Sequence, residues 1–219
     1  MPTDAVPQTT LKFPWHLLEI NELLMRHLKR CDLEEIKPCI ESGAIIDGPV
    51  FIERGAKIAG SAVLRGPCVI RAGAVIGDHA LVRDGSYIGR NVVVGAHSEV
   101  KNSLVYDGTK MHNAIVLDSI VGENCNLGAG TITHNTRADG KPVRSMEKGE
   151  KVSTNLRHLG AVIGAGAKIY GAHLMPGVKV GEDSIVGDIA AAKDVANRRW
   201  KYLADDGKVV ETDSPKKRE

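Results

Sequence analysis

The stretch from Asn126 to Arg137, NLGAGTITHNTR, combines glycines with asparagine, threonine and histidine, residue types that could bind a ligand. Backbone N–H groups of a glycine-rich loop can hold a phosphate, but the pattern GxxxxGK[ST] is absent and no strand-to-helix transition is expected here. A short distance upstream lies His112, and histidine is the side chain that most readily exchanges a proton near neutral pH. What these residues can do therefore depends on the element that positions them.

That element is a sequence repeat with a period of six. Aliphatic residues recur in strict register at Ile46, Ile52, Ile58, Leu64, Ile70, Ile76, Val82, Ile88, Val94 and Val100. Four residues after each of them stands a residue that is mostly small: Val50, Ala56, Ala62, Cys68, Ala74, Ala80, Ser86, Val92, Ser98 and Leu104. A period of six fits neither an α-helix nor a flat strand, and it is typical of a hexapeptide β-helix.

In such a repeat the aliphatic residue points inward, the small residue fits the tight interior, and Gly, Asn or Asp forms the corner. An aromatic content of only 4% agrees with a narrow core. Cys68 and Cys125 occupy the small inward position, so we interpret them as core thiols rather than nucleophiles. These units resemble hexapeptide repeats known to wind as a left-handed parallel β-helix with three units per coil and coils about 4.8 Å apart. The predicted fold class is therefore all-β.

The period also predicts how the chain is organised. Residues 1–43 form an N-terminal segment, residues 44–196 form the β-helix, and residues 197–219 form a tail without hexad register. The N-terminal segment contains an amphipathic helix whose expected apolar stripe is Leu17, Ile20, Leu24 and Leu28. Shortened units continue through Val105, Met111, Val116, Val121, Leu127 and Thr133, and the register resumes at Ile163, Ile169, Leu174, Val180 and Val186. The break at 134–160 predicts a polar, basic loop or hairpin that projects from the prism, a common place for function.

The register also predicts the surroundings of His112. With three units per coil, Met111 and Leu127 begin the same side one coil apart, so Gly128 should lie beside His112. A residue without a side chain would leave the outward imidazole open to a ligand, and Asn126 would border the same space. His79 and His97 also occupy outward positions; without predicted partners, they are assigned no role.

Composition excludes several classes of function. The formal net charge of +2 gives no global argument for binding nucleic acid or a membrane. The N-terminus lacks the order of a signal peptide, and no apolar run approaches the roughly 20 residues of a membrane span, so we expect a cytoplasmic protein. The four cysteines and eight histidines show no metal-binding spacing, so neither a structural zinc, a disulfide framework nor a catalytic metal is expected.

The segment from Lys101 to Val143, KNSLVYDGTKMHNAIVLDSIVGENCNLGAGTITHNTRADGKPV, resembles the acetyltransferase half of bifunctional glucosamine-1-phosphate N-acetyltransferase/sugar-1-phosphate nucleotidylyltransferases, especially the archaeal-type branch. The segment FPWHLLEINELL is similar to the arm helix that joins the two halves of these proteins. The likeness covers roughly residues 12 to 190. Because only about a dozen residues precede the arm helix, we expect the nucleotidylyltransferase domain to be missing.

This resemblance implies a homotrimer that binds acetyl-CoA between subunits and acetylates an amino-sugar 1-phosphate, either glucosamine-1-phosphate or galactosamine-1-phosphate. It implies roles for six residues: His112 as general base, Asn135 in the active site, Asn126 in contact with the sugar, and Lys141, Arg144 and Lys101 as substrate-binding cations. Arg offers a planar fork and Lys a point charge to a phosphate. The CoA-contacting residues are not assigned.

Two departures from the family pattern bear on the substrate. The active-site tyrosine expected three residues after the histidine is Ile115, and the segment KMHN is one residue shorter than usual. Two other functions therefore stay open. The chain could be a non-catalytic β-helix subunit that assembles with a separate nucleotidylyltransferase through the arm helix, or an acyltransferase for another amine or hydroxyl acceptor.

Overall fold

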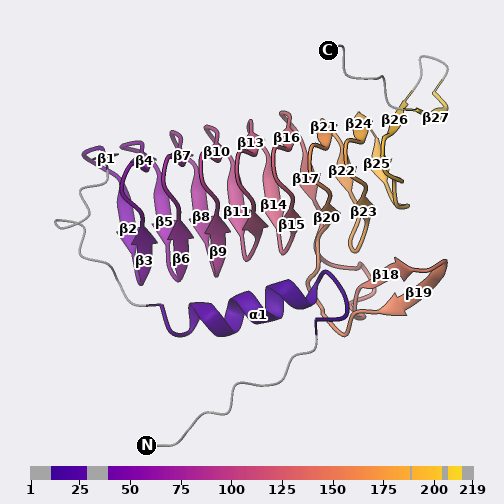
Figure 1. Ribbon diagram of the computed structural model, residues 1–219, viewed down its shortest axis with the longest axis horizontal. Helices are drawn as coiled ribbons and strands as arrows, with labels where there is room; N and C mark the ends of the chain where they lie inside the picture. The colour runs from indigo at the N-terminus through magenta and orange to yellow at the C-terminus, as the bar shows by residue number, and fades with distance from the viewer. Residues whose placement is uncertain (1–10, 29–38, 188, 204–206, 214–219) are drawn as a thin grey trace, which may run out of the picture.

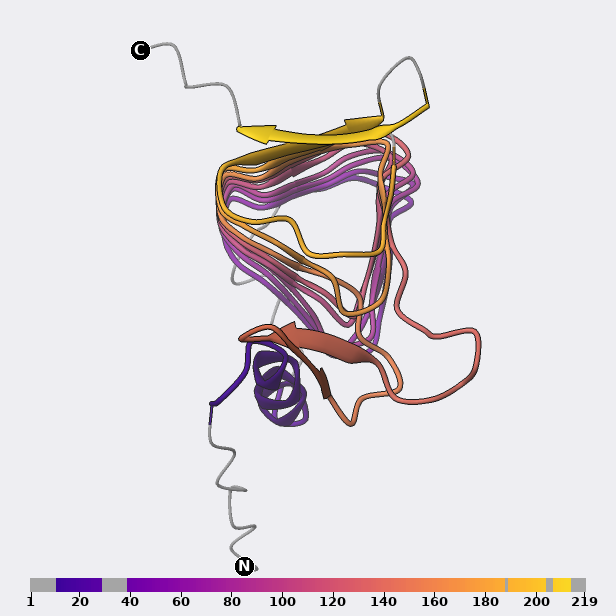
Figure 2. The same ribbon diagram turned by 90° about the vertical axis from the view of Figure 1, so that its right-hand side faces the viewer.

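In the computed structural model the chain forms a three-sided prism, a left-handed parallel β-helix, with one α-helix lying along its side (Figures 1 and 2). The structure describes residues 11–28, 39–187, 189–203 and 207–213. Each coil contributes one short strand to each of three sheets, so strands far apart in the sequence lie side by side. The predicted all-β fold class is confirmed.

The three sheets are called A, B and C here. Sheet A contains β1 (Cys39–Ile40), β4 (Lys57–Ile58), β7 (Val75–Ile76), β10 (Val93–Val94), β13 (Lys110–Met111), β16 (Asn126–Leu127), β21 (Lys168–Tyr170), β24 (Ile185–Gly187), β26 (Arg199–Leu203) and β27 (Val209–Asp213). Sheet B contains β2 (Ile45–Asp47), β5 (Val63–Arg65), β8 (Leu81–Arg83), β11 (Glu99–Lys101), β14 (Ile115–Leu117), β17 (Ile132–Thr133), β22 (His173–Leu174) and β25 (Ala190–Ala191). Sheet C contains β3 (Val50–Ile52), β6 (Cys68–Ile70), β9 (Ser86–Ile88), β12 (Leu104–Val105), β15 (Ile120–Val121), β20 (Val162–Ile163) and β23 (Lys179–Val180).

The strand register confirms three hexads per coil. Ile58 pairs with Ile76 and Ile76 with Val94, eighteen residues apart each time. The next two coils are shorter, because Val94 pairs with Met111 and Met111 with Leu127. Below, the corner where strands of sheet A lead into sheet B is called the A/B edge, and the corner between sheets B and C is called the B/C edge.

The interior is built from the residues that the repeat predicts, with one correction. The ten aliphatic positions are buried, apart from Ile46 in the first coil, which is only partly buried. The prediction that Leu104 is a small inward residue is wrong: Ser103 takes that place, fully buried, and Leu104 pairs with outward-facing Tyr87. The shortened coil moves the register by one residue, which turns Leu104 to the outer face.

The two core cysteines should be chemically inert in the folded protein. Burial raises the pKa of the Cys68 thiol to about 12 and that of Cys125 to about 11, and the thiolate is the form that reacts. We expect iodoacetamide at pH 8 to leave both unmodified in the native protein and to alkylate both after unfolding, as read by peptide mass spectrometry. Exposed Cys39 serves as the internal control, since it should react in both states. Fast native labelling of Cys68 or Cys125 would contradict the core assignment.

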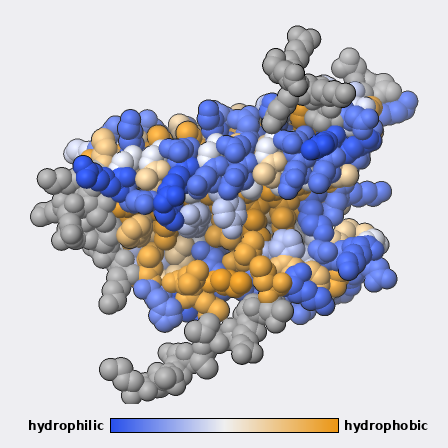
Figure 3. Space-filling view, in the orientation of Figure 1, coloured by the Kyte–Doolittle hydropathy of each residue, from blue (hydrophilic) through white to orange (hydrophobic). Residues whose placement is uncertain are grey.

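The helix α1 (His16–Met25) packs against the outer face of sheet C, but with a different side from the one predicted. Its buried residues are Leu18, Asn21 and Met25, and Trp15 directly before it is also buried, whereas Leu24 of the predicted stripe is 67% exposed. Trp15 and Leu18 pack on Leu104 and Ile120 of sheet C, and the Asn21 amide donates a 2.6 Å hydrogen bond to the Gly85 carbonyl. These contacts set the rotation of the helix. Figure 3 shows hydrophobic residues gathered along α1 and on the prism face beside it.

Two further elements depart from the regular coil. The break in the repeat contains an antiparallel hairpin, β18 (Arg144–Glu147) and β19 (Glu150–Ser153), which lies beside the prism next to α1 (Figure 2). The segment after the last coil is not an unattached tail in its described part, because β26 pairs with β24 and turns back through β27 to extend sheet A. Among the described residues, no helix is long and apolar enough to cross a membrane.

Candidate active site

His112 stands at the A/B edge between two glycines of the neighbouring coils. The pairing of Met111 with Leu127 places Gly128 beside His112, as predicted, and the His112 N–H donates a 2.9 Å hydrogen bond to the Leu127 carbonyl. Gly95 occupies the corresponding place in the preceding coil and donates a 2.9 Å bond to the Met111 carbonyl. The imidazole is exposed and has no polar partner within the described ranges. The side chain is therefore accessible to a ligand.

Asn126 lies in the next coil, two residues before Gly128. It is half-buried on the outer face of sheet A, where it pairs with Lys110. It thus approaches the A/B edge near His112 from the side of sheet A. That Asn126 contacts a ligand beside His112 stays a prediction.

Lys101 and Asn135 come together at the B/C edge, around an acidic residue that sequence reasoning missed. Asp118 is only 2% exposed. Its Oδ2 accepts hydrogen bonds from Lys101 Nζ at 3.1 Å and Asn135 Nδ2 at 2.5 Å, and its Oδ1 accepts one from Asn102 Nδ2 at 2.7 Å. Lys101 precedes Asp118 by seventeen residues, which is one coil, and Asn135 follows it by the same number. The coil register could therefore have placed Asp118 beside both residues.

This cluster defines what its members can offer a ligand. An ionised carboxylate can only accept hydrogen bonds, so the Asn135 amide must turn its N–H₂ group toward Asp118. Its carbonyl oxygen then remains available as an acceptor. The Lys101 ammonium is already paired with a carboxylate, which reduces its attraction for a phosphate.

The two clusters lie at opposite edges of sheet B. Strand β14 connects them, with His112 three residues before it and Asp118 directly after it. The backbone of β14 is extended, with a rise of about 3.3 Å per residue, and holds the two clusters apart at its two ends. Ile115 begins β14 and pairs with Glu99 and Ile132 on the outer face of sheet B. A single chain therefore does not bring His112 together with Lys101 and Asn135.

The remaining predicted cations belong to the loop. Lys141 is exposed, and its backbone N–H donates a 3.2 Å hydrogen bond to Asp139. Arg144 is exposed at the start of β18. Neighbouring Arg137 holds Asp139 through two bonds of 2.8 and 2.6 Å, and the pKa of Asp139 is lowered by this guanidinium. Lys141 and Arg144 have no such side-chain partner in the part of the chain described, and the same holds for Lys148, Lys151 and Arg157 of the loop.

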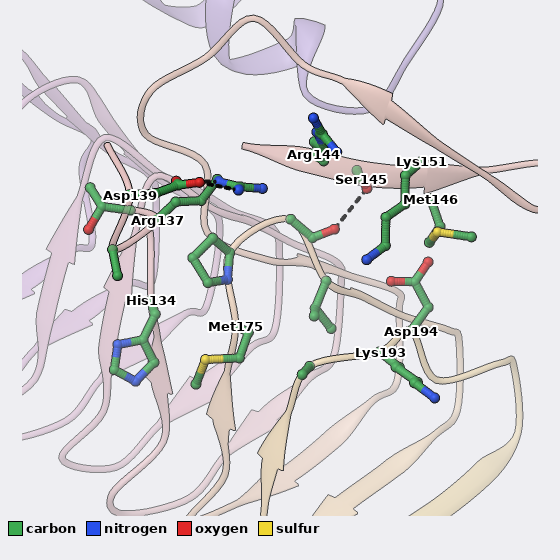
Figure 4. A pocket seen from close by; sticks show the side chains of 16 residues that line it. His134, Arg137, Asp139, Arg144, Ser145, Met146, Lys151, Met175, Lys193 and Asp194 are labelled. Atoms are coloured by element: carbon green, nitrogen blue, oxygen red, sulfur yellow. Dashed lines mark hydrogen bonds and ion pairs between the residues drawn. The ribbon is translucent and has the colours of Figure 1, made fainter. Parts of the chain in front are cut away.

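A cleft of about 1120 Å³ separates the hairpin from the last coils (Figure 4). Ser145 Oγ donates a 2.8 Å hydrogen bond to the Gly177 carbonyl, and Lys179 Nζ lies 2.9 Å from a Glu147 carboxylate oxygen, so the hairpin is fixed to the prism. Arg144 lines this cleft, whereas His112, Lys101 and Lys141 do not. This cleft is therefore separate from the predicted general base.

Four other histidines form two neighbouring pairs. His134 lines the cleft, and its ring lies 3.2 Å from a ring nitrogen of His173. Burial, and then the neighbouring His173, lower the pKa of His134. His79 and His97 are stacked on each other with ring centroids 5.0 Å apart, so the expectation that they have no partners is wrong.

The prism, its six-residue repeat and the open histidine at its edge define a hexapeptide-repeat left-handed β-helix. A family model described as the GMPPB C-terminal domain matches residues 64–154. The chain is homologous to the C-terminal part of archaeal GlmU-like bifunctional sugar-1-phosphate nucleotidylyltransferase/acetyltransferases.

The similarity extends over most of this chain. This chain is 42% identical over 176 residues to the bifunctional protein GlmU of Methanococcus aeolicus, and the match covers 80% of this chain and 42% of that protein. It is 35% identical over 170 residues to the bifunctional sugar-1-phosphate nucleotidylyltransferase/acetyltransferase of Sulfurisphaera tokodaii, covering 77% of this chain and 42% of that protein. The chain thus spans less than half of each relative.

Among solved structures, the N-acyltransferase AntD from Bacillus cereus is similar at 14% identity, with a TM-score of 0.43, covering 87% of this chain and 92% of that one. That structure holds a dTDP-amino sugar and coenzyme A.

Proposed function

We propose that this protein transfers the acetyl group of acetyl-CoA to the amine of an amino-sugar 1-phosphate, glucosamine-1-phosphate or galactosamine-1-phosphate. The observation that carries the proposal is exposed His112, which has no polar partner among the described residues and stands between Gly95 and Gly128, in a chain homologous to the C-terminal part of GlmU-like proteins. The named activities of these relatives supply the class of reaction.

Acetyl transfer requires a base that takes a proton from the attacking amine. The amine nitrogen forms a bond to the thioester carbonyl carbon, and the carbon–sulfur bond breaks to release the CoA thiol. His112 accepts the proton that the amine loses and can return it to the departing sulfur. An imidazole without a protein partner is free for both steps, whereas the stacked His79 and His97 are not so placed.

The acceptor would be held by the remaining predicted residues. Asn126 is near enough to the A/B edge to contact the sugar. The Asn135 carbonyl oxygen, left free by Asp118, can accept a hydrogen bond from a sugar hydroxyl or an ammonium. Lys141 and Arg144 lack side-chain partners in the described part and are the better anchors for the phosphate, with Lys101 contributing less because of Asp118.

We further propose that the working unit is a homotrimer. In one chain His112 and the Lys101–Asn135 cluster face different edges of sheet B, so a compact site needs the B/C edge or the loop of a neighbouring protomer beside the A/B edge of the first. Gel filtration with light scattering should give three times the chain mass of 23.5 kDa.

The alternative of a non-catalytic assembly subunit depends on an arm helix whose apolar side has no packing partner within the chain. In this structure α1 buries Trp15, Leu18 and Met25 against its own chain, which removes most of that motive. An acceptor other than an amino-sugar phosphate is still favoured by one observation, the aliphatic Ile115 on the outer face of sheet B where a hydroxyl partner would stand.

The test is release of CoA thiol from acetyl-CoA in the presence of each amino-sugar 1-phosphate. We expect turnover with at least one epimer and none with the same sugar lacking its phosphate, because the loop cations would have no anion to bind. Turnover with the unphosphorylated sugar alone would move the assignment to another acceptor. No turnover with either epimer, in a folded protein, would sink the proposed reaction.

A further inference from the structure

The A/B edge carries a column of glycines that is interrupted by two chemically distinct side chains. The register places Gly95, His112, Gly128, Tyr170 and Gly187 one above another in successive coils. Sequence reasoning identified only His112 and Gly128. Tyr170 is the next outward side chain beyond them. It lies two coils from His112, which is about 10 Å along the axis of the prism.

Tyr170 occupies the space that Gly128 leaves open. A Cβ atom on Gly128 would lie 3.1 Å from Cδ1 of the Tyr170 ring and 3.2 Å from the Ile169 carbonyl oxygen. The ring therefore lies against Gly128, in the coil between Tyr170 and His112. Between the ring and His112 the A/B edge presents the backbone of Gly128, and this stretch of the edge is called the slot below.

The slot is open on its outer side. Tyr170 is 44% exposed, and within the described ranges its hydroxyl has no hydrogen-bond partner. By comparison Tyr202, which pairs with Gly187 one coil further on, packs against Trp200 with ring centroids 4.9 Å apart and the two ring planes tilted. An exposed ring without a packing partner on its outer side is available to a ligand.

The absence of charge from this column of residues bears on which substrate, the sugar phosphate or the acyl donor, lies along it. From Gly128 through Tyr170 to Gly187 it carries no charged side chain, and Gly187 itself is buried where it pairs with Tyr202. The cations that could anchor a phosphate lie beside this column and not in it: Lys110 and Lys168 on sheet A, Lys101 at the B/C edge, and Lys141 and Arg144 on the loop. An extended, uncharged chain with a reactive carbonyl at its end, as in a pantetheine thioester, suits a groove of backbone and aromatic ring.

We propose that Tyr170 contacts the acyl donor: its ring forms the wall of a slot over Gly128 that holds the thioester end of the pantetheine arm against His112. This rests on the proposed function, and it names a donor-binding residue that the sequence motifs do not include. The ring provides the contact through its apolar face, so the hydroxyl is dispensable.

The test compares Tyr170→Ala, Tyr170→Phe and Gly128→Ala by steady-state kinetics with each substrate varied in turn. Tyr170→Ala should raise the KM for acetyl-CoA about tenfold, equivalent to about 1.4 kcal/mol, with the KM for the sugar phosphate within twofold. Tyr170→Phe should leave both values within twofold. Gly128→Ala should raise the KM for acetyl-CoA, because the added methyl group displaces the Tyr170 ring. The double variant Gly128→Ala/Tyr170→Ala should have nearly the same KM for acetyl-CoA as Tyr170→Ala alone, because it has no ring to displace.

Direct binding keeps the result independent of turnover. Calorimetric titration with coenzyme A should show the same tenfold weakening for Tyr170→Ala, both in the native background and with His112→Ala. Ile45→Ala is the matched control, since it removes another exposed large apolar residue, 56% exposed, at the opposite end of the prism. It should change neither CoA affinity nor the melting temperature.

The outcomes separate the two proposals. Unchanged CoA affinity in a folded Tyr170→Ala protein, or a rise confined to the KM of the sugar phosphate, would overturn the inference even if His112→Ala abolishes turnover. Weakened CoA binding without turnover on either sugar would support the slot while the proposed acceptor fails.

Discussion

Replacing His112 by alanine should lower kcat for acetyl transfer by a factor of about 10²–10⁴, the usual contribution of general acid–base catalysis. The amine must lose a proton as it attacks, and within the described residues at the A/B edge His112 is the titratable side chain exposed between two glycines. The fold should be unaffected, because the imidazole is exposed and makes no polar contact in the described part. Thiol release gives kcat, and circular dichroism gives the melting temperature.

His79→Ala is the matched control for this experiment. His79 is also exposed and lies at a corner of the prism, two coils from the candidate base. Its ring stacks on that of His97. We expect full activity in that variant. More than a tenth of the native kcat in His112→Ala would show that another group takes the proton, and the assignment of the base would then be wrong.

The success of the sequence prediction at His112 has a simple physical origin. A period of six fixes which residues point inward, and three hexads per coil fix which residues become neighbours between coils. Gly128 could therefore be placed beside His112 from residue numbers alone, and the register confirms it. The same arithmetic reaches Tyr170 only after the length of the inserted loop is known, since Leu127 pairs with Ile169 across it.

What the period could not supply depends on contacts between elements. The rotation of α1 follows from Trp15 packing and from the Asn21 bond to Gly85, and neither is encoded in the spacing of leucines. Leu104 was misplaced because a shortened coil shifts the register where the repeat itself gives no mark. Asp118 was missed for a related reason: carboxylates are common at corners, and only the neighbouring coils show that this one is buried.

Replacing that buried carboxylate is the change with the largest expected effect on stability. Asp118→Ala leaves the Lys101 ammonium and the amides of Asn102 and Asn135 without their common acceptor. Removing one partner of a buried pair typically costs 3–5 kcal/mol. Because the Lys101 side chain is 23% exposed and can turn toward water, we expect the lower end, about 3 kcal/mol. For a chain of this size the melting temperature should fall by roughly 6–12 °C.

A graded series separates the charge from the hydrogen bonds at Asp118. Asn102→Ala removes one donor and leaves the carboxylate paired with Lys101, so it should cost about 1 kcal/mol. Asp118→Asn keeps one acceptor oxygen but turns an N–H₂ group toward other donors, and should fall between the two alanine variants. At a temperature where all remain folded, Asp118→Ala and Asp118→Asn should raise the KM for the sugar phosphate and leave CoA affinity unchanged, because they release Asn135 but do not touch the A/B edge. Equal stability of Asp118→Ala and the native protein would mean that this carboxylate does not hold the corner together, and Asn135 would then lose its argued orientation.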